Sequence, residues 1–222
     1  MLPTTTDLFA AGDDVAPVVG VEVIGPGSCV LRGFALGDDP LLLAALHAVL
    51  AAAPLRHMVT PGGLRMSVAM TNCGSLGWVS DRRGYRYDPL DPQTGKPWPP
   101  MPPSFARLAA RAAAHAGFSG FIPDACLVNR YEAGTRLSLH QDRNERDFDA
   151  PIVSVSLGIP ATFLFGGDSR AERPVRIPLR HGDVVVWGGP DRLRFHGVAP
   201  LRDGWHAALG SARFNLTMRK AG

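Results

Sequence analysis

The first half of the chain contains two segments in which apolar residues recur at helical spacing. The first, residues 38–53, opens at Asp38 with a capping acid that is followed two residues later by a proline, and Pro54 helps to end it. The second, residues 103–116, repeats its apolar positions at i, i+3, i+4 and i+7, which are Phe105, Leu108, Ala109 and Ala112. Each pattern predicts a helix.

From residue 125 onward the pattern changes to short apolar segments separated by turn residues. About eight strands at regular spacing are typical of a barrel or a double-sheet jelly roll, and two preceding helices would cover one face of the sheet. We therefore expect a mainly β fold with N-terminal helices and a double-stranded β-helix, or jelly-roll, core. The predicted strands are Ala125–Tyr131, Leu137–His140, Ile152–Leu157, Thr162–Phe165, Val175–Leu179, Val184–Trp187, Leu193–Val198 and Ala212–Arg219.

The segment between the two helices has a different character. Residues 57–103 are rich in Gly, Pro, Trp and Tyr, with a predicted strand at Met66–Asn72, and we interpret them as a strand pair with long loops that forms a lid. Residues 1–18 are expected to form a loosely held arm. Residues 19–222 are expected to form a single domain, with the jelly-roll core over residues 125–219.

Composition narrows the class of protein and its compartment. An apolar fraction of 45% and a charged fraction of 19% exclude a disordered chain. The three cysteines form no CxxC motif, the N-terminus lacks the features of a signal peptide, and the longest apolar stretch is interrupted by His47. We expect a cytoplasmic protein that does not engage membranes. The net charge of +3 permits a polyanionic partner without requiring one.

One short motif suggests a metal site. His140 and Asp142 stand two residues apart at the end of a predicted strand, so their side chains point to the same side. His196 lies on a later predicted strand. Two histidines and one carboxylate on one face of an iron(II) ion form the facial triad of non-heme oxygenases, which leaves the other positions open for a bidentate co-substrate and dioxygen.

The chain contains a second motif of the same spacing, His181-Gly182-Asp183, which makes the spacing alone a weak signal. Its central glycine suggests a turn ahead of a strand. Too little chain then separates it from His196 for a jelly roll to bring the two together. We therefore favour the pair at His140 and Asp142 on geometry.

The last predicted strand offers a site for a small dicarboxylate. Residues 213–219 alternate strictly, with Arg213, Asn215, Thr217 and Arg219 on one face. Guanidinium groups bind carboxylates through two parallel hydrogen bonds. Asn129 and Tyr131 add a second pair on a shared face of another strand. The alternative is an exposed edge strand with a polar outer face.

Several segments in order resemble the AlkB family of nucleic-acid dealkylases, and the resemblance runs from about Asp7 to Lys220. It implies an iron(II) ion held by His140, Asp142 and His196, with 2-oxoglutarate and dioxygen as co-substrates. It further implies that 2-oxoglutarate is bound by Asn129, Tyr131, Arg213, Asn215 and Arg219, with Arg213 at the distal carboxylate and Arg219 nearer the metal. The segments that carry the resemblance are MVTPGG (58–63), MSVAMTNCGSLGW (66–78), GYRYDPLDPQTGKPWP (84–99), PDACLVNRY (123–131), SLHQD (138–142), PIVSVSLGIPATFLFGG (151–167), HGDVVVWGG (181–189) and RFNLTMR (213–219).

The activity that this resemblance implies is oxidative demethylation of 1-methyladenine and 3-methylcytosine in DNA, with single strands preferred, and in RNA as well. Such an enzyme releases formaldehyde and succinate, repairs alkylation damage and acts as a monomer. Residues 57–103 would then form a nucleotide-recognition lid. The residues expected to contact the substrate are Trp78, Tyr85, Tyr87, Asn144 and Arg170. The family's pattern has an aspartate where this sequence has Asn144, which keeps an acceptor oxygen but loses the charge, so an altered lesion preference is expected.

Two other functions are compatible with the sequence. The first is an oxygenase of the same class that acts on RNA or on a protein side chain. The second is a jelly-roll binding module without catalytic turnover, in which the metal site is degenerate or structural.

Overall fold

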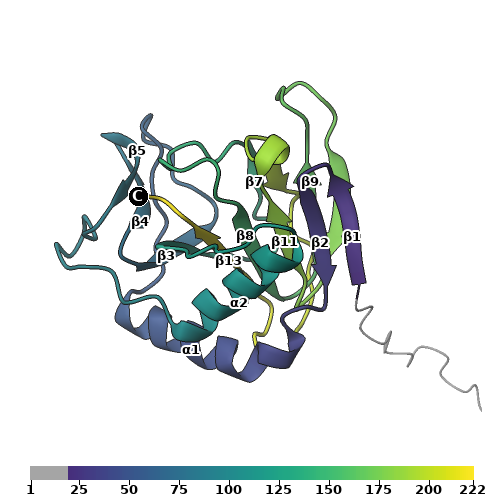
Figure 1. Ribbon diagram of the computed structural model, residues 1–222. Helices are drawn as coiled ribbons and strands as arrows, with labels where there is room; N and C mark the ends of the chain where they lie inside the picture. The colour runs from purple at the N-terminus through teal and green to yellow at the C-terminus, as the bar shows by residue number, and fades with distance from the viewer. Residues whose placement is uncertain (1–19) are drawn as a thin grey trace, which may run out of the picture.

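Two β-sheets that face each other form the frame of the molecule (Figure 1). The structure, a computed structural model, describes residues 20–222, so the arm predicted for residues 1–18 lies outside the described residues. The strands are β1 (Gly20–Gly25), β2 (Ser28–Arg32), β3 (Ala69–Gly74), β4 (Gly77–Asp81), β5 (Gly84–Asp88), β6 (Ala125–Tyr131), β7 (Leu137–His140), β8 (Ile152–Gly158), β9 (Ala161–Phe165), β10 (Val175–Leu179), β11 (Val184–Trp187), β12 (His196–Val198) and β13 (Arg213–Arg219). The larger sheet has the order β1-β2-β11-β8-β13-β6-β3 and the smaller one β10-β9-β12-β7. This is the predicted jelly roll.

Strand β13 lies inside the larger sheet rather than at its edge. It pairs antiparallel with β8 on one side and with β6 on the other, and every one of its residues is buried. Leu216 and Met218 enter the core beneath the helices. Arg213 and Asn215, on the opposite face, line a cavity between the sheets. The alternative of an exposed edge strand is therefore wrong, and the polar face of β13 points inward.

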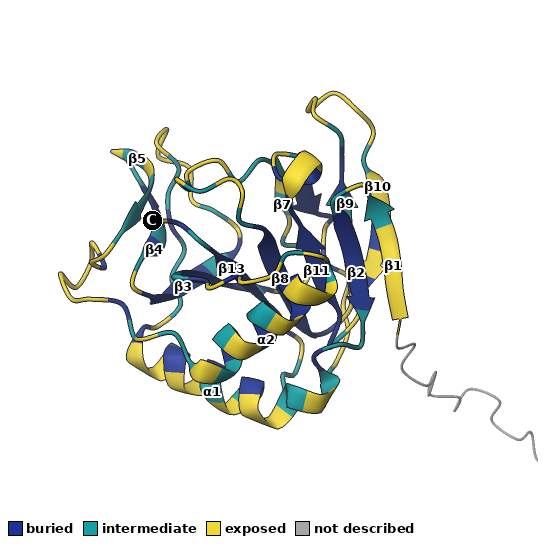
Figure 2. Cartoon of the chain, viewed as in Figure 1, coloured by how far each residue is buried: buried dark blue, intermediate teal, exposed yellow. Residues whose placement is uncertain are grey.

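Helices α1 (Asp39–Ala52) and α2 (Pro103–His115) cover the outer face of the larger sheet, as predicted (Figure 1). Their apolar sides, which include Leu46 and Phe105, join one buried cluster with that sheet, while their outer sides are exposed (Figure 2).

The capping role predicted for Asp38 is wrong. Asp38 stands at the N-cap of α1, but its side chain makes no capping hydrogen bond. It ends a short 3-10 helix, Leu36–Asp38, and its backbone is therefore helical, whereas a capping residue is typically extended. Its carboxylate instead accepts a hydrogen bond from Arg111 of α2 at 2.8 Å, which links the two helices.

Two predicted strands differ from the observed ones. The strand predicted at Met66–Asn72 begins later, as β3, and joins the larger sheet beside β6. The strand predicted at Leu193–Val198 is shortened to β12. A 3-10 helix, Gly189–Asp191, precedes it, and the Arg194 N–H bonds to the Asp191 carbonyl, which keeps this stretch out of the extended conformation. The hairpin of β1 and β2 extends the larger sheet beyond the predicted strands.

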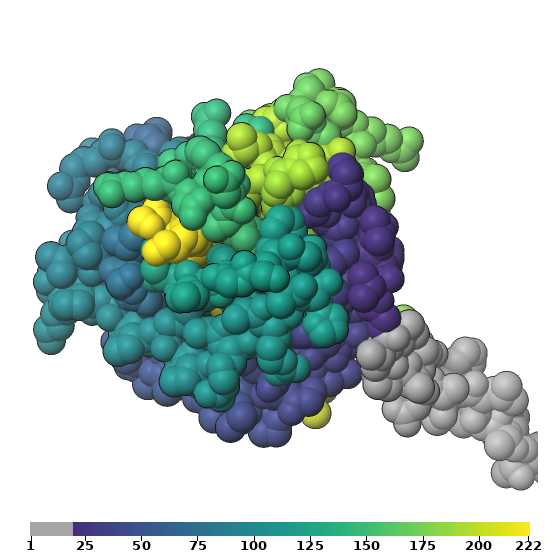
Figure 3. All heavy atoms as spheres, viewed as in Figure 1, coloured from purple at the N-terminus to yellow at the C-terminus, as the bar shows by residue number. Residues whose placement is uncertain are grey.

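The strand pair predicted in the lid segment is the hairpin of β4 and β5, which forms a small sheet of its own. Figure 3 shows the C-terminal end of the chain, in yellow, at the surface between this segment and the green stretch that follows β7. None of the helices within residues 20–222 is long and apolar enough to cross a membrane.

The space between the two sheets holds an apolar cluster and a cavity. Phe163, Ile177 and Trp187 belong to the cluster, which joins the sheets through β9, β10 and β11. The cavity is bordered by β6, β7, β12 and β13, lies on the side of the lid segment, and is lined by polar and apolar side chains. This cavity contains the candidate site.

Candidate metal centre and co-substrate pocket

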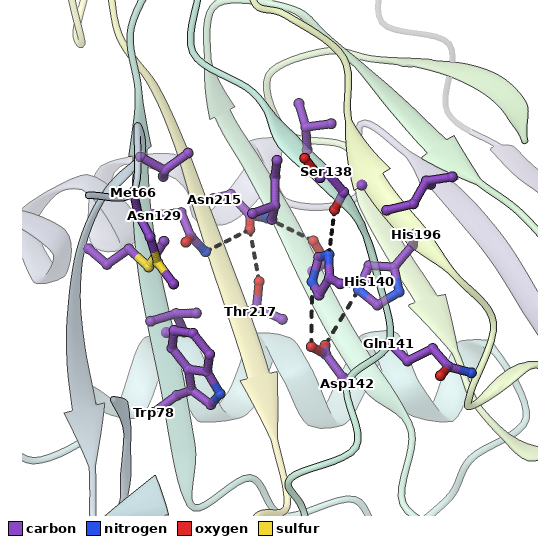
Figure 4. Close-up of a pocket in the computed structure, with 18 of the residues that line it drawn as sticks. Met66, Trp78, Asn129, Ser138, His140, Gln141, Asp142, His196, Asn215 and Thr217 are labelled. Carbon is purple, nitrogen blue, oxygen red and sulfur yellow. Dashed lines mark hydrogen bonds and ion pairs between the residues drawn. The ribbon is translucent and has the colours of Figure 1, made fainter. Parts of the chain in front are cut away.

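A cavity of about 740 Å³ lies between the sheets (Figure 4), and residues of the β4–β5 hairpin line it. Tyr87 is the one residue predicted to contact ligand or substrate that does not line it. The predicted residues that do line it are Trp78, Tyr85, Asn129, Tyr131, His140, Asp142, Asn144, Arg170, His196, Arg213, Asn215 and Arg219.

Three side chains suited to metal ligation gather on one wall of this cavity. His140 ends β7 and His196 begins β12, and the two are partners in the antiparallel register. Their Nε2 atoms lie 3.7 and 3.6 Å from the carboxylate oxygens of Asp142. One ligand atom from each residue lies within 4.8 Å of the others, which is close enough for all three to bind one metal ion.

The second nitrogen of each imidazole contacts the main chain. Nδ1 of His140 is 2.9 Å from the Ser138 carbonyl oxygen, and Nδ1 of His196 is 3.0 Å from the Arg194 carbonyl oxygen. Because a carbonyl oxygen only accepts hydrogen bonds, each Nδ1 carries a proton, and in the neutral form of either ring Nε2 then keeps its lone pair. Both rings thus have the tautomer that a metal ion needs.

The protonation states of His140 and Asp142 also favour metal binding. Burial, together with the neighbouring His196, lowers the pKa of His140 to about 4. Burial by itself would raise the pKa of Asp142, but Arg219 and the two imidazoles outweigh it and hold that pKa well below its usual range. Near pH 7 the His140 ring is therefore neutral and Asp142 is ionised, and these are the forms that bind metal.

Arg213 is a buried guanidinium with unused hydrogen-bonding capacity. It is 2% exposed, its Nη2 donates to the Ser156 hydroxyl at 3.0 Å, and its Cζ lies 5.0 Å from the Tyr131 ring centroid. Within residues 20–222 its Nε and Nη1 have no hydrogen-bond partner, and the buried Oδ1 of Asn129 has none either. Since an unpaired buried charge is costly, this arrangement fits an anionic ligand such as a carboxylate.

Asn215 and Arg219 continue the polar face of β13 toward the metal-ligand wall. Asn215 donates to the Ser154 hydroxyl at 2.7 Å and accepts a hydrogen bond from Asn129 at 3.2 Å (Figure 4). Arg219 donates to Asp142 through Nη2 and Nε at 2.6 and 2.9 Å. Burial would lower the pKa of Arg219, but Asp142 and other anionic neighbours raise it, so this guanidinium stays charged.

The rim of the cavity is aromatic and partly exposed. Trp78 and Tyr85 stack with ring centroids 5.7 Å apart and an interplanar angle of 15°. The Trp78 indole N–H donates to Asn144 Oδ1 at 3.2 Å. Tyr87 lies outside the cavity because its hydroxyl points to the buried carboxylate of Glu145, to which it donates at 2.6 Å.

The second His-Gly-Asp motif lies elsewhere and has other partners. His181 Nδ1 accepts a hydrogen bond from the Gly158 N–H at 2.9 Å, and its Nε2 lies 2.9 Å from Asp39. Asp183 accepts a hydrogen bond from Arg32 at 2.7 Å. Gly182 has a φ of +84°, as expected for the predicted turn. This motif therefore joins the turn before β11 to strand β8, helix α1 and strand β2.

Two buried charges beside the metal-ligand wall were not predicted from the sequence. Arg192 and Glu145 are 3% and 5% exposed and form an ion pair at 3.3 Å. Both lie in irregular segments, where no alternation of polar and apolar residues marks an inward-facing side chain. The only available signal was the position of Glu145 three residues after Asp142.

Comparison with known proteins matches the geometry. The sequence profile of the 2OG-Fe(II) oxygenase superfamily matches residues 27–219. The alpha-ketoglutarate-dependent dioxygenase AlkB of Salmonella typhimurium is 55% identical over 215 residues, which cover 97% of each chain. The AlkB of Escherichia coli is 54% identical over 97% of this chain and 98% of its own.

The chain belongs to the AlkB family of 2OG-Fe(II) oxygenases. The solved structure of OsALKBH1 has the same fold, with a TM-score of 0.79 and 26% identity over 90% of this chain and all of that one. This AlkB-family chain is an Fe(II)/2-oxoglutarate-dependent dioxygenase whose cofactor and co-substrates are iron(II), 2-oxoglutarate and dioxygen. Two Arg213 nitrogens that have no partner within residues 20–222, and the two imidazoles protonated at Nδ1, fit this set.

Proposed function

We propose that this dioxygenase oxidatively demethylates bases of the 1-methyladenine and 3-methylcytosine type in DNA, with single strands preferred, and in RNA. It releases formaldehyde and succinate, and it serves the repair of alkylation damage. The observation that carries the proposal is the combination, in one cavity, of a His-Asp-His cluster, a buried arginine with two nitrogens that lack a partner within residues 20–222, and a partly exposed aromatic rim.

In this proposal His140, Asp142 and His196 hold the iron. Iron(II), when bound, supplies the redox chemistry that couples oxidation of 2-oxoglutarate to oxidation of the N-methyl group. The main-chain hydrogen bonds at both Nδ1 atoms hold the two rings in orientation.

The co-substrate is held by the polar faces of β6 and β13. Arg213 binds the distal carboxylate through the nitrogens that have no partner among the described residues. Arg219 lies nearer the metal, where it already contacts Asp142. The remaining residues proposed to contact 2-oxoglutarate are Asn129, Tyr131 and Asn215.

The substrate base enters beneath the lid, residues 57–103. A base must leave the duplex, or already be single-stranded, to reach a cavity of this kind. Trp78 of the rim stacks on it, with the His140 ring on the other face, and Tyr85, Tyr87 and Arg170 contact the neighbouring strand. Asn144 accepts a hydrogen bond from the base in place of Trp78. The protein acts as a monomer, with residues 19–222 as one domain.

Mass spectrometry of methylated oligonucleotides tests this function directly. The protein is incubated with iron(II), 2-oxoglutarate and ascorbate, and with single-stranded DNA, duplex DNA, RNA or a peptide. We expect loss of one methyl group per succinate formed, fastest on single-stranded DNA, and no reaction with His140→Ala. Succinate formation without methyl loss from any nucleic acid would assign the enzyme to another substrate. Absence of iron-dependent succinate would indicate a binding module.

A further inference from the structure

Asn144 and Glu145, two adjacent residues of the loop after Asp142, accept hydrogen bonds from the β4–β5 hairpin. Trp78 of β4 and Tyr87 of β5 are register partners across this hairpin. The Trp78 indole donates to Asn144, and the Tyr87 hydroxyl donates to Glu145 at 2.6 Å. The hairpin is thus joined to the segment that carries a metal ligand, once at the surface and once in the interior.

In the interior contact, the Tyr87 hydroxyl donates to the Glu145 carboxylate, whose burial is energetically unfavourable. The Glu145 side chain is 1% exposed. An ionised carboxylate without partners would be strongly unfavourable in such a place. Glu145 is compensated by Arg192 Nη2 at 3.3 Å and Arg219 Nε at 3.4 Å, and by the Tyr87 hydroxyl.

The same two arginines hold Asp142. Arg219 donates to the Asp142 carboxylate at 2.6 Å, and Arg192 Nη1 donates to the Asp142 main-chain carbonyl at 2.8 Å. Arg192 also donates to the Ala150 carbonyl at 3.0 Å, which fixes the far end of the loop. Two buried guanidinium groups therefore lie between the buried Glu145 carboxylate and the partly buried Asp142 carboxylate, and the positive and negative charges balance.

We propose that Glu145 is a positioning residue for Asp142 that acts through Arg192 and Arg219; this rests on the iron site of the proposed function. Without the Glu145 charge, Arg219 loses one of its two carboxylate partners, and its positive charge is then balanced by Asp142 alone. The network also acquires one excess positive charge beside the site of a divalent cation. Both changes weaken metal binding. Glu145 acts indirectly, because it does not itself contact the ligand atoms, which are the two histidine Nε2 atoms and the Asp142 carboxylate.

The affinity of the protein for a metal ion, rather than its enzymatic turnover, tests the positioning role of Glu145 directly. Mn²⁺ is titrated into the full chain with saturating 2-oxoglutarate, and free Mn²⁺ is followed by electron paramagnetic resonance. Glu145→Gln keeps the size of the side chain and an acceptor for Tyr87, and removes only the charge. We expect its dissociation constant for Mn²⁺ to rise roughly tenfold to a hundredfold, as is usual when a residue that orients a metal ligand is lost.

Glu145→Asp keeps the charge but withdraws the carboxylate by one methylene, so it should bind Mn²⁺ with intermediate affinity. Urea unfolding shows whether each variant folds. If Glu145→Gln does not fold, Glu145→Asp tests the proposal in its place. Tyr87→Phe should weaken Mn²⁺ binding more than its matched control Tyr85→Phe, because the Tyr85 hydroxyl has no hydrogen bond to Glu145.

A folded Glu145→Gln or Glu145→Asp protein that binds Mn²⁺ as tightly as the wild type would overturn the positioning role. A wild-type protein that binds Mn²⁺ no better than Asp142→Ala would instead overturn the metal site of the proposed function. The two failures are therefore distinguishable within one set of titrations.

Discussion

His196 stands directly opposite His140 in the antiparallel register of β12 and β7, and their ring centroids lie 4.4 Å apart. The pairing of two strands that are more than fifty residues apart in the sequence thus brings two imidazoles to one point. Asp142, just beyond the end of β7, completes the group. The metal site therefore depends on a single strand register, since a shift by one residue would turn one ring to the other face of the sheet.

Replacing one imidazole should remove metal binding and turnover together. His196→Ala leaves two of three ligands, and we expect Mn²⁺ affinity to fall by at least roughly a hundredfold and succinate formation to be lost. Titration calorimetry and succinate assays measure the two effects. His47→Ala, on the exposed side of α1, is the control. Near-normal Mn²⁺ affinity in His196→Ala would exclude this residue as a ligand.

Arg213→Lys should weaken 2-oxoglutarate binding while preserving charge. A lysine cannot supply the two parallel donors of a guanidinium. Loss of one charged hydrogen bond costs about 1.5–3 kcal/mol, which corresponds to a rise in KM for 2-oxoglutarate of roughly tenfold to a hundredfold. Arg176→Lys, at an exposed position of β10, should leave this KM unchanged. Equal KM values for Arg213→Lys and wild type would contradict the carboxylate assignment.

Trp78→Ala should raise the KM for a methylated oligonucleotide and leave that for 2-oxoglutarate nearly unchanged. Stacking of a base on an aromatic ring contributes about 1–3 kcal/mol. Trp205 is 79% exposed and lies outside the cavity, so Trp205→Ala is a matched control. Steady-state kinetics with both substrates separate the two effects. A Trp78→Ala enzyme with unaltered oligonucleotide KM would remove the stacking role.

Asn144→Asp should change the preference among lesions. The substitution restores a negative charge at the rim and retains an acceptor for the Trp78 indole. We expect a severalfold gain in kcat/KM for cationic 1-methyladenine and 3-methylcytosine at low salt, which shrinks at high salt because the rim is exposed. Identical kinetics of the wild type and Asn144→Asp on both lesions would show that a charge at position 144 does not affect lesion preference.

The free energy of unfolding should depend on pH through His206. Burial, together with the neighbouring His181 and against the opposing effect of Asp39, lowers the pKa of His206 below its usual value of 6.5. The unfolded chain then binds a proton more readily than the folded one, so the stabilisation is present above pH 6.5 and is lost as the pH falls below it. Urea unfolding at several pH values should show a steeper loss in the wild type than in His206→Gln. Parallel curves would contradict the shift.

The local pattern of residues was sufficient for much of the fold. Both helices and most strands were predicted within one or two residues, because periodicity reports which side of an element faces a core. The failures have local causes as well. Asp38 could not cap α1 because a 3-10 helix precedes it, and β12 is short because the turn at Gly189–Asp191 bends the chain before it.

By itself the sequence determined which side chains could perform the chemistry: a histidine and an aspartate on one side of a strand, and arginines on one face of β13. Only the tertiary structure decided that β13 lies inside its sheet, that β12 pairs with β7 in the register that sets His196 opposite His140, and that Glu145 is buried between two arginines. Spacing along the chain fixes the direction of neighbouring side chains. The pairing of distant strands and the balance of buried charges depend on contacts between residues far apart in sequence, and no local pattern encodes them.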